Sequence, residues 1–334
     1  MRLRLAIIFI VLSLMLGACG YPGAPDITST PIPTDTQIAP PTLTATPTIP
    51  LAVLVLPAEF DPDTSNLYQK TVYDLAQASG LRFQVRNTLT AVDLEPGLKV
   101  VIALPPDPGI ASLAAAAPDV QFLAINIPDI TAAGNISVLG NNSQSDISAF
   151  LAGYTAALIT DDYRTGMMIP KDNADAIRAL NAFANGMKFY CGSCRPLFYF
   201  QWAFPQYIEI GAEEDPANYD AYADILMLQY KVSTIYLHPD IATTDLITYI
   251  GTTGTSMIGT ITPEQQPAGW VMTIQPDVIK AIQNAWPNLI QGQGGIIVQS
   301  PLGLADIDPS LLSPGKQRLV EQTLSDLQAG LISP

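Results

Sequence analysis

Three cysteines and one histidine limit the chemistry that side chains of this chain could perform. Cys191 and Cys194 are separated by two residues, a spacing found both in redox-active pairs and in local disulfides. A redox pair belongs at the start of a helix that follows a strand. This pair instead follows a predicted helix, which favours a structural disulfide. Structural zinc needs four Cys or His ligands, so we expect no metal and no cofactor.

The single histidine, His238, directly follows a predicted buried strand at residues 232–237. A catalytic histidine would need a positioned nucleophile and an orienting acid. The chain contains neither a G-x-S-x-G nor an H-E-x-x-H motif, which mark common nucleophile and zinc sites. We therefore expect His238 to form a hydrogen bond to a ligand or within its loop, and we expect a binding protein with no enzymatic activity.

Aromatic side chains supply a second kind of candidate contact. Residues 198–204 are an aromatic cluster that contains Trp202, and Trp270 lies in the predicted strand 269–274, a return crossing between two lobes. Aromatic faces stack on bases and sugars, so both tryptophans are candidate ligand contacts. Packing in the core or at a hinge is the alternative for the cluster.

The third cysteine, Cys19, has the setting of a lipidation site. An apolar run of 12 residues, 5–16, follows two arginines and is too short to span a bilayer. Residues 16–19 read Leu-Gly-Ala-Cys, which matches a bacterial lipoprotein box, although an ordinary secretion signal is the alternative. We predict that residues 1–19 are a lipoprotein signal peptide. Acyl chains such as palmitate on Cys19 would then anchor the protein to the extracytoplasmic face of the cell membrane.

Residues 20–50 have the composition of a tether. Eight prolines fall between residues 21 and 50, and this segment carries only two charged side chains. Such a sequence cannot bury a core, and each proline fixes φ and removes a backbone donor. As polyproline II it would reach on the order of 90 Å.

The length and composition of the whole chain limit the number of domains it can form and the partners it can bind. Its 334 residues are enough for two domains, and 48% of them are hydrophobic. The formal net charge is −15, which argues against nucleic acid because polyanion binding needs clustered Lys and Arg. A neutral or cationic small molecule is compatible with this charge. We expect a monomer.

Strand-like and helix-like segments alternate along the chain after residue 50. The first set predicts strands at 51–56, 81–86, 98–104, 120–125 and 136–140, with helices at 65–79, 110–117 and 147–158. The second set predicts strands at 165–170, 207–210, 232–237, 256–260, 269–274 and 294–300, with helices at 172–188, 216–229, 240–251, 276–289 and 314–329.

This alternation predicts an α/β fold with two doubly wound, Rossmann-like lobes. Lobe 1 would span residues 51–160 plus about 275–295, and lobe 2 residues 161–272 plus about 296–334. The helical spacing places Leu67, Val72 and Leu75 among the core residues of the first helix, and Leu319 among those of the last.

Ligands of doubly wound sheets bind beyond the carboxyl ends of the strands. Three predicted loops of lobe 1 leave strands at that edge, at residues 59–66, 107–109 and 126–129. They supply Asn66, Asp107 and Asn126 as candidate ligand contacts. Helix capping and turn formation are equally good explanations for such residues.

The centre of the chain resembles the basic membrane protein (BMP) family of substrate-binding lipoproteins, the purine-nucleoside-receptor type. The matching motifs are FLAG at 150–153 with AAL at 156–158, GMMIPKD at 166–172, and FANG at 183–186. The resemblance extends more weakly from about residue 51 to about residue 300. It implies a type I periplasmic-binding-protein clamshell, and it adds Asp172 to the candidate ligand contacts.

The resemblance also implies a function. It predicts an ABC-type importer component that captures a nucleoside-like or sugar-like solute between two lobes and delivers it to an ABC permease. The segments at 238–244 and 260–264 depart from the family pattern, so a purine nucleoside does not follow. A ligand-sensing surface receptor, or a scaffold of the same fold that has lost its ligand, is the alternative.

Overall fold

The structure, a computed structural model, describes residues 49–140, 144–195 and 202–334. Cys19, the predicted signal peptide, nearly all of the predicted tether and residues 198–201 of the aromatic cluster lie outside the described residues. Residues 47–334 form one compact unit, and all four clusters of buried hydrophobic residues lie inside it. We therefore expect this unit to fold by itself.

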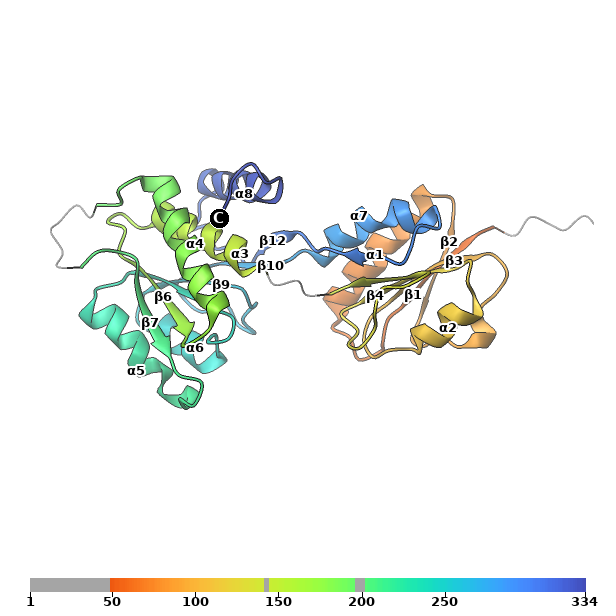
Figure 1. Ribbon diagram of the computed structural model, residues 1–334, viewed down its shortest axis with the longest axis horizontal. Coiled ribbons are helices and arrows are strands. Elements are labelled where there is room, and N and C mark those ends of the chain that lie inside the picture. The colour runs from red at the N-terminus through yellow and green to blue at the C-terminus, as the bar shows by residue number, and fades with distance from the viewer. Residues whose placement is uncertain (1–48, 141–143, 196–201) are drawn as a thin grey trace, which may run out of the picture. The chain divides into compact units, whose positions relative to one another are not determined.

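Lobe 1 is built on a parallel sheet of six strands (Figure 1). The strands are β1 (Leu51–Val55), β2 (Arg82–Arg86), β3 (Leu98–Ala103), β4 (Gln121–Ile125), β5 (Ile136–Leu139) and β11 (Ile297–Val298). Their spatial order is β11-β5-β4-β3-β1-β2, and every pairing is parallel. The helices are α1 (Pro62–Ala78), α2 (Ile110–Ala116) and α7 (Val278–Ile290).

Lobe 2 repeats this plan with a second sheet. Its strands are β6 (Thr165–Pro170), β7 (Gln206–Ile210), β8 (Thr234–Leu237), β9 (Ser256–Gly259), β10 (Trp270–Pro276) and β12 (Leu302–Ala305). They lie in the order β12-β10-β9-β8-β6-β7, and only β12 runs antiparallel to its neighbour. The helices are α3 (Ser145–Ile159), α4 (Ala174–Cys191), α5 (Tyr219–Asp224) continued by the π-helical turn η3 (Ile225–Gln229), α6 (Thr244–Gly251) and α8 (Pro314–Gln328).

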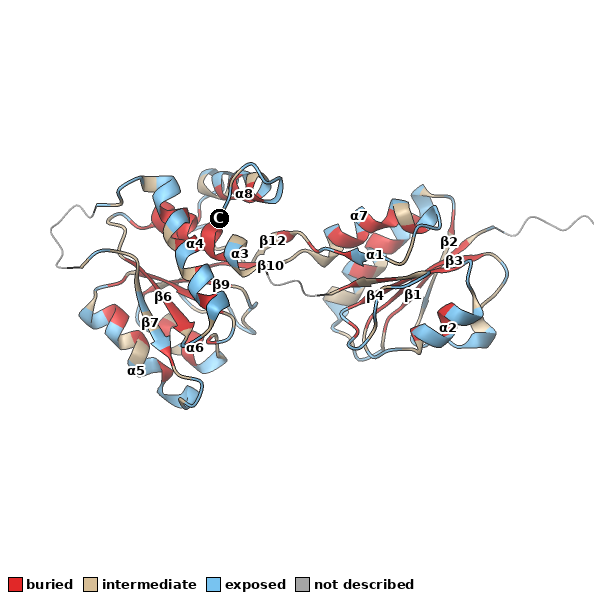
Figure 2. Ribbon diagram, in the orientation of Figure 1, coloured by how far each residue is buried: buried red, intermediate tan, exposed pale blue. Residues whose placement is uncertain are grey.

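Helices cover both faces of each sheet, which explains why the central strands are continuously apolar, whereas the edge strands β2 and β7 also contain polar residues. In lobe 1, buried residues of α1 and α7 share one cluster with strand residues such as Leu54, while α2 packs with Val53 on the opposite face. In lobe 2, α3, α4 and α8 cover one face, and α5, η3 and α6 cover the other. Figure 2 shows the result as central strands that are buried along most of their length.

The chain crosses between the two sheets three times. It passes from β5 to α3, from β10 to α7 and from β11 to β12. Two doubly wound lobes with these crossings are the architecture of type I periplasmic binding proteins, as the sequence predicted. Two predicted boundaries are wrong: α3 packs with α4 in lobe 2 rather than ending lobe 1, and β11 joins the sheet of lobe 1 rather than lobe 2.

Local signals explain where α1 begins. The Asp61 carboxylate accepts a hydrogen bond of 2.8 Å from the backbone N–H of Thr64, and Pro62 occupies the first helical turn. The helix therefore begins at residue 62, three residues earlier than its apolar spacing predicts. Asn66, predicted in a loop, lies inside this helix with an exposed side chain.

Two glycines allow α3 and α4 to pack backbone against backbone. A Cβ atom placed on Gly153 would lie 2.0 Å from the carbonyl oxygen of Phe183, and one placed on Gly186 would lie 1.9 Å from that of Phe150. Only glycine fits at such an approach. Both glycines belong to the FLAG and FANG motifs, so these motifs form the contact between the two helices.

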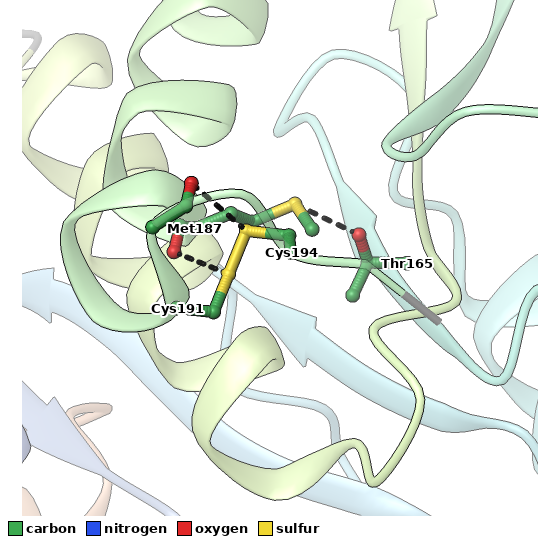
Figure 3. The surroundings of a disulfide bond; sticks show 5 residues. Thr165, Met187, Cys191 and Cys194 are labelled. Atoms are coloured by element: carbon green, nitrogen blue, oxygen red, sulfur yellow. Dashed lines mark hydrogen bonds between the residues drawn. A yellow bond between two sulfur atoms is a disulfide. The ribbon is translucent and has the colours of Figure 1, made fainter. Parts of the chain in front are cut away.

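The disulfide joins Cys191 to Cys194 at the carboxyl end of α4 (Figure 3). The Cα atoms are 5.0 Å apart, and the Cys191 sulfur lies 3.0 Å from the carbonyl oxygen of Met187. Nearby, the hydroxyl of Thr165 donates to the Met187 sulfur at 2.9 Å, which ties the end of α4 to the start of β6. The pair therefore follows a helix and closes its last turn.

Among the described residues, no helix is both long and apolar enough to cross a bilayer.

Candidate ligand site at the carboxyl edge of the second sheet

The strand order of lobe 2 identifies a topological switch point between β6 and β8. The chain leaves β6 toward β7 on one side and returns to β8 on the other. Open α/β sheets bind ligands in the crevice beyond the carboxyl ends of the strands at this point. In lobe 2 the residues that leave those ends are Lys171 to Asn173 after β6, His238 to Asp240 after β8, and Thr260 after β9.

A pocket of about 250 Å³, here called the α3 pocket, lies at this edge in front of the first turn of α3. Its polar lining includes Ser145, Ser148 and Thr260, and its apolar lining includes Ile274, Pro276 and Leu302. Tyr236 and Pro239 complete it on the β8 side. None of these side chains is charged, so the α3 pocket suits an uncharged, partly apolar group.

The first turn of α3 has no side-chain cap. Gln144 occupies the N-cap position, but its amide donates instead to the carbonyl oxygen of Ser300 at 2.7 Å. Backbone N–H groups in the first turn of a helix have no partner within the helix. In α3, however, the Ile147 N–H donates to the Asp146 carboxylate at 2.9 Å and the Ser148 N–H donates to the Gln144 carbonyl oxygen at 2.9 Å. The polar groups of this turn that line the α3 pocket are therefore those of Ser145 and Ser148.

His238 is buried at the switch point with one ring nitrogen unpartnered. Only 4% of the residue is exposed, and Nε2 has no hydrogen-bond partner among the described residues. The other nitrogen, Nδ1, accepts the backbone N–H of Asp240 at 3.3 Å. An imidazole that accepts at Nδ1 carries its hydrogen on Nε2 in the neutral form. Nε2–H is therefore a buried donor.

Burial also keeps His238 neutral. It lowers the pKa of the imidazole, and the charges of Asp240 and Asp175 oppose this effect only in part. The Asp240 carboxylate lies 3.6 Å from Nδ1, beyond hydrogen-bond distance, and receives the amide of Asn173 at 3.5 Å. Asn173 in turn caps α4, so one chain of contacts connects the loops that follow β6 and β8.

Thr260 was missed in the sequence, although it follows a strand as directly as His238 does. Its hydroxyl oxygen is buried and has no partner among the described residues. Tyr236 pairs with Ile258 in the parallel register of β8 and β9, and a continuation of this register by two residues would place His238 opposite Thr260. Side chains alternate along a strand, so this continuation places both residues on the face of Tyr236. Tyr236 and Thr260 line the α3 pocket, whereas His238 is buried and is not part of its lining.

The candidates of lobe 1 have structural roles or stand alone. Asp107 accepts the backbone N–H groups of Gly109 and Ile110 at 2.9 Å each, which caps α2. Asn126 ends β4 with a positive φ of 51° and an exposed side chain. Asn66 lies within α1 and not in a loop. The three candidate residues of lobe 1 therefore do not form a polar cluster.

Neither tryptophan lies in the α3 pocket. Trp202 packs edge-on against Tyr230, with ring centroids 5.4 Å apart, near the amino ends of β7 and β8. Trp270 is fully buried, and its indole covers Gly259 and donates to the Thr273 hydroxyl at 3.2 Å. Both side chains make packing contacts in lobe 2, and their role as ligand contacts stays a prediction.

Asp172 lies at the switch point but faces solvent. It follows β6 with a positive φ of 56° and is exposed. Within the described ranges, no three His, Cys, Asp or Glu side chains gather in a group able to hold a metal ion. The lining of the α3 pocket is uncharged, and the charged side chains of Lys171, Asp172 and Asp240 belong to the loops beside it.

Comparisons with known proteins add distant structural similarities. No family model matches the chain, and no curated protein matches it. A solved transcriptional activator of the comK gene from Bacillus halodurans is 12% identical, covering 83% of this chain and 96% of that chain at a TM-score of 0.49. An ABC transporter solute-binding protein from Aeropyrum pernix K1 is 15% identical, covering 86% and 93% at 0.43.

A third solved structure is a LacI family regulator from Enterococcus faecium with bound ribose. It is 12% identical, covering 77% of this chain and 97% of that chain at a TM-score of 0.37. Because all three TM-scores are below 0.5, we assign the fold from the strand order of the chain and its three crossings.

Proposed function

We propose that the chain is a membrane-anchored substrate-binding lipoprotein of an ABC-type importer, related to the BMP family. It captures a small nucleoside-like or sugar-like solute between its two lobes and performs no catalysis. The observation that carries this proposal is the α3 pocket. It lies at the carboxyl edge of the sheet of lobe 2. The buried polar atoms of Thr260, which lines it, and of His238, which precedes its lining residue Pro239, have no hydrogen-bond partner among the described residues.

The fold supports capture by domain closure. Chain crossings between two lobes are hinges that a few backbone rotations can bend, and a bound solute stabilises the closed form. The uncharged lining of the α3 pocket and the net charge of −15 both favour a neutral solute over an anion.

Native mass spectrometry of residues 47–334 tests solute capture. The protein is measured as purified and again after incubation with a panel of nucleosides and sugars. We expect a stoichiometric adduct and a raised melting temperature with at least one compound. A bare mass with every compound and no thermal stabilisation would contradict solute binding and favour a scaffold role.

Anchoring is tested separately, because it depends on Cys19 and not on the α3 pocket. The Cys19→Ala variant of the full chain should be released from the membrane fraction, while the wild type stays bound. The matched control is Cys191→Ala, which leaves the lipoprotein box intact. Membrane binding by the Cys19→Ala variant would contradict the lipid anchor.

A further inference from the structure

The described residues contain five buried side-chain polar atoms without a hydrogen-bond partner. They belong to Gln121, Ser137, His238, Thr260 and Ser300. Native proteins pair nearly all such atoms, because an unpaired buried donor has lost its water without a replacement. Unpaired atoms that lie next to each other at the carboxyl edge of a sheet therefore indicate a partner that is not part of the chain.

His238 and Thr260 are such a pair. Their strands β8 and β9 are adjacent, and a continuation of the strand register by two residues places them opposite each other. The residues two positions before them, Tyr236 and Ile258, pack in the same cluster as α3. Continuing the registers of the neighbouring strand pairs by one residue places Ile169 of β6 beside His238 and Ile274 of β10 beside Thr260. Two polar side chains are thus flanked by apolar ones, and Nε2 and the hydroxyl do not bond to each other.

The chemistry of the pair restricts what it can bind. Nε2 carries a hydrogen because Nδ1 accepts the Asp240 backbone N–H, and the hydroxyl of Thr260 can also donate. The Nε2–H donor requires an acceptor atom, and the Thr260 hydroxyl can donate to that same atom. A cation offers none, and an anion would meet no cationic side chain in the α3 pocket while Asp175 and Asp240 lie near the imidazole.

We infer that His238 Nε2–H and the Thr260 hydroxyl form a donor subsite for an uncharged oxygen or ring-nitrogen acceptor of the solute. The apolar side chains of Ile274, Pro276 and Leu302 contact the rest of that group. This inference rests on the proposed solute-binding function and names the part of the solute that lobe 2 recognises. It makes Thr260 and His238 specificity-determining residues.

The single histidine makes the inference directly testable. Residues 47–334 with ¹⁵N-labelled histidine give imidazole signals from His238 alone. We would titrate uridine, inosine, ribose and glucose, and as charged counterparts uridine monophosphate and gluconate, with native mass spectra recorded in parallel. We expect a neutral compound that binds to shift the Nε2 signal in a saturable way, with the ring still neutral. Its charged counterpart should bind at least tenfold more weakly.

Paired variants separate the hydrogen bond from the shape of the site. Thr260→Val removes the hydroxyl at nearly constant volume and should weaken binding about tenfold, the value of one neutral hydrogen bond, whereas Thr260→Ser should restore it. His238→Gln retains a donor near Nε2 and should bind better than His238→Leu. Ser137→Ala is the control, because it removes another unpartnered buried hydroxyl, in lobe 1.

Each outcome decides between the two claims. A compound that adds its mass but leaves the His238 signals unmoved, or binds Thr260→Val as tightly as wild type, overturns the donor subsite and leaves solute binding intact. Tighter binding of the charged counterparts also overturns it. If no compound adds mass, solute binding of this class fails, and the donor subsite fails with it.

Discussion

Replacing Gly153 with alanine should force α3 and α4 apart. The added Cβ would lie 2.0 Å from the carbonyl oxygen of Phe183, and the corresponding Cβ on Gly186 would lie 1.9 Å from the carbonyl oxygen of Phe150. Cβ atoms essentially never approach other heavy atoms within 3.0 Å, so the helices must separate by about 1 Å at this crossing. The obstructing atoms are backbone atoms and cannot rotate away.

The cost follows from two opposing effects. Overpacking of a core costs about 1–3 kcal/mol, and a rigid backbone obstacle should place this case at the upper end. Alanine regains about 1 kcal/mol over glycine through its higher helix propensity. We therefore expect Gly153→Ala and Gly186→Ala each to lower the free energy of unfolding by about 2 kcal/mol, which corresponds to a fall of about 4–8 °C in melting temperature.

Thermal and urea unfolding of residues 47–334, followed by circular dichroism, measures this cost. Gly315→Ala is the matched control, because Gly315 lies in α8 with no atom within 4 Å of an added Cβ, and its replacement should be neutral or stabilising. The double variant should lose less than the sum, because the separation caused by one Cβ makes room for the other. If Gly153→Ala is as stable as wild type, the close contact of the two helices is refuted.

Three further predictions concern the pH dependence, the disulfide and the tryptophans. Burial lowers the pKa of His238 from its ordinary value of 6.5, so the unfolded chain binds the proton more readily than the folded one. The contribution of His238 to stability should therefore be complete above pH 6.5 and decrease as the pH falls below it. Melting curves recorded between pH 7.5 and 5 should show this decrease for the wild type and not for His238→Gln. Reducing the Cys191–Cys194 bond, which closes a very short loop, should cost about 2 kcal/mol, and a variant with both cysteines replaced by serine should not respond to reductant. Trp270→Ala should cost about 3–5 kcal/mol because the indole is fully buried, and Trp202→Ala should leave solute binding unchanged.

Apolar runs, or alternation as in β2, predicted nearly every strand, because a sheet covered on both faces needs continuous hydrophobic residues in its central strands. The exception is β12, a four-residue strand that contains a glycine and pairs antiparallel at an edge. Helix faces were harder to predict. Val72 is fully buried as expected, but Leu67 and Leu319 are 51% and 49% exposed. Which side of a helix is buried depends on its partner, and spacing alone does not identify that partner.

The position of α3 could not be predicted for the same reason. The helix is buried almost all round, so its sequence shows no preferred face and is compatible with either lobe. Its contact with α4 through Gly153 and Gly186 places α3 in lobe 2, and these two glycines are 33 positions apart in the sequence. A glycine in a predicted helix signals a close approach, but the sequence does not say to what.

The candidate site shows what the family resemblance can and cannot predict. Its FLAG and FANG motifs lie in the interface of α3 and α4, where their glycines are required by packing, so they predict the fold and say nothing about the ligand. The ligand must be inferred from the segments that follow β8 and β9, which are the segments that depart from the family pattern. His238 was predicted there because a lone histidine stands out, whereas Thr260 became visible only once the register placed its unpaired hydroxyl beside the imidazole. A change of solute within this fold would therefore require changes at residues 238 and 260 and none in the helix motifs.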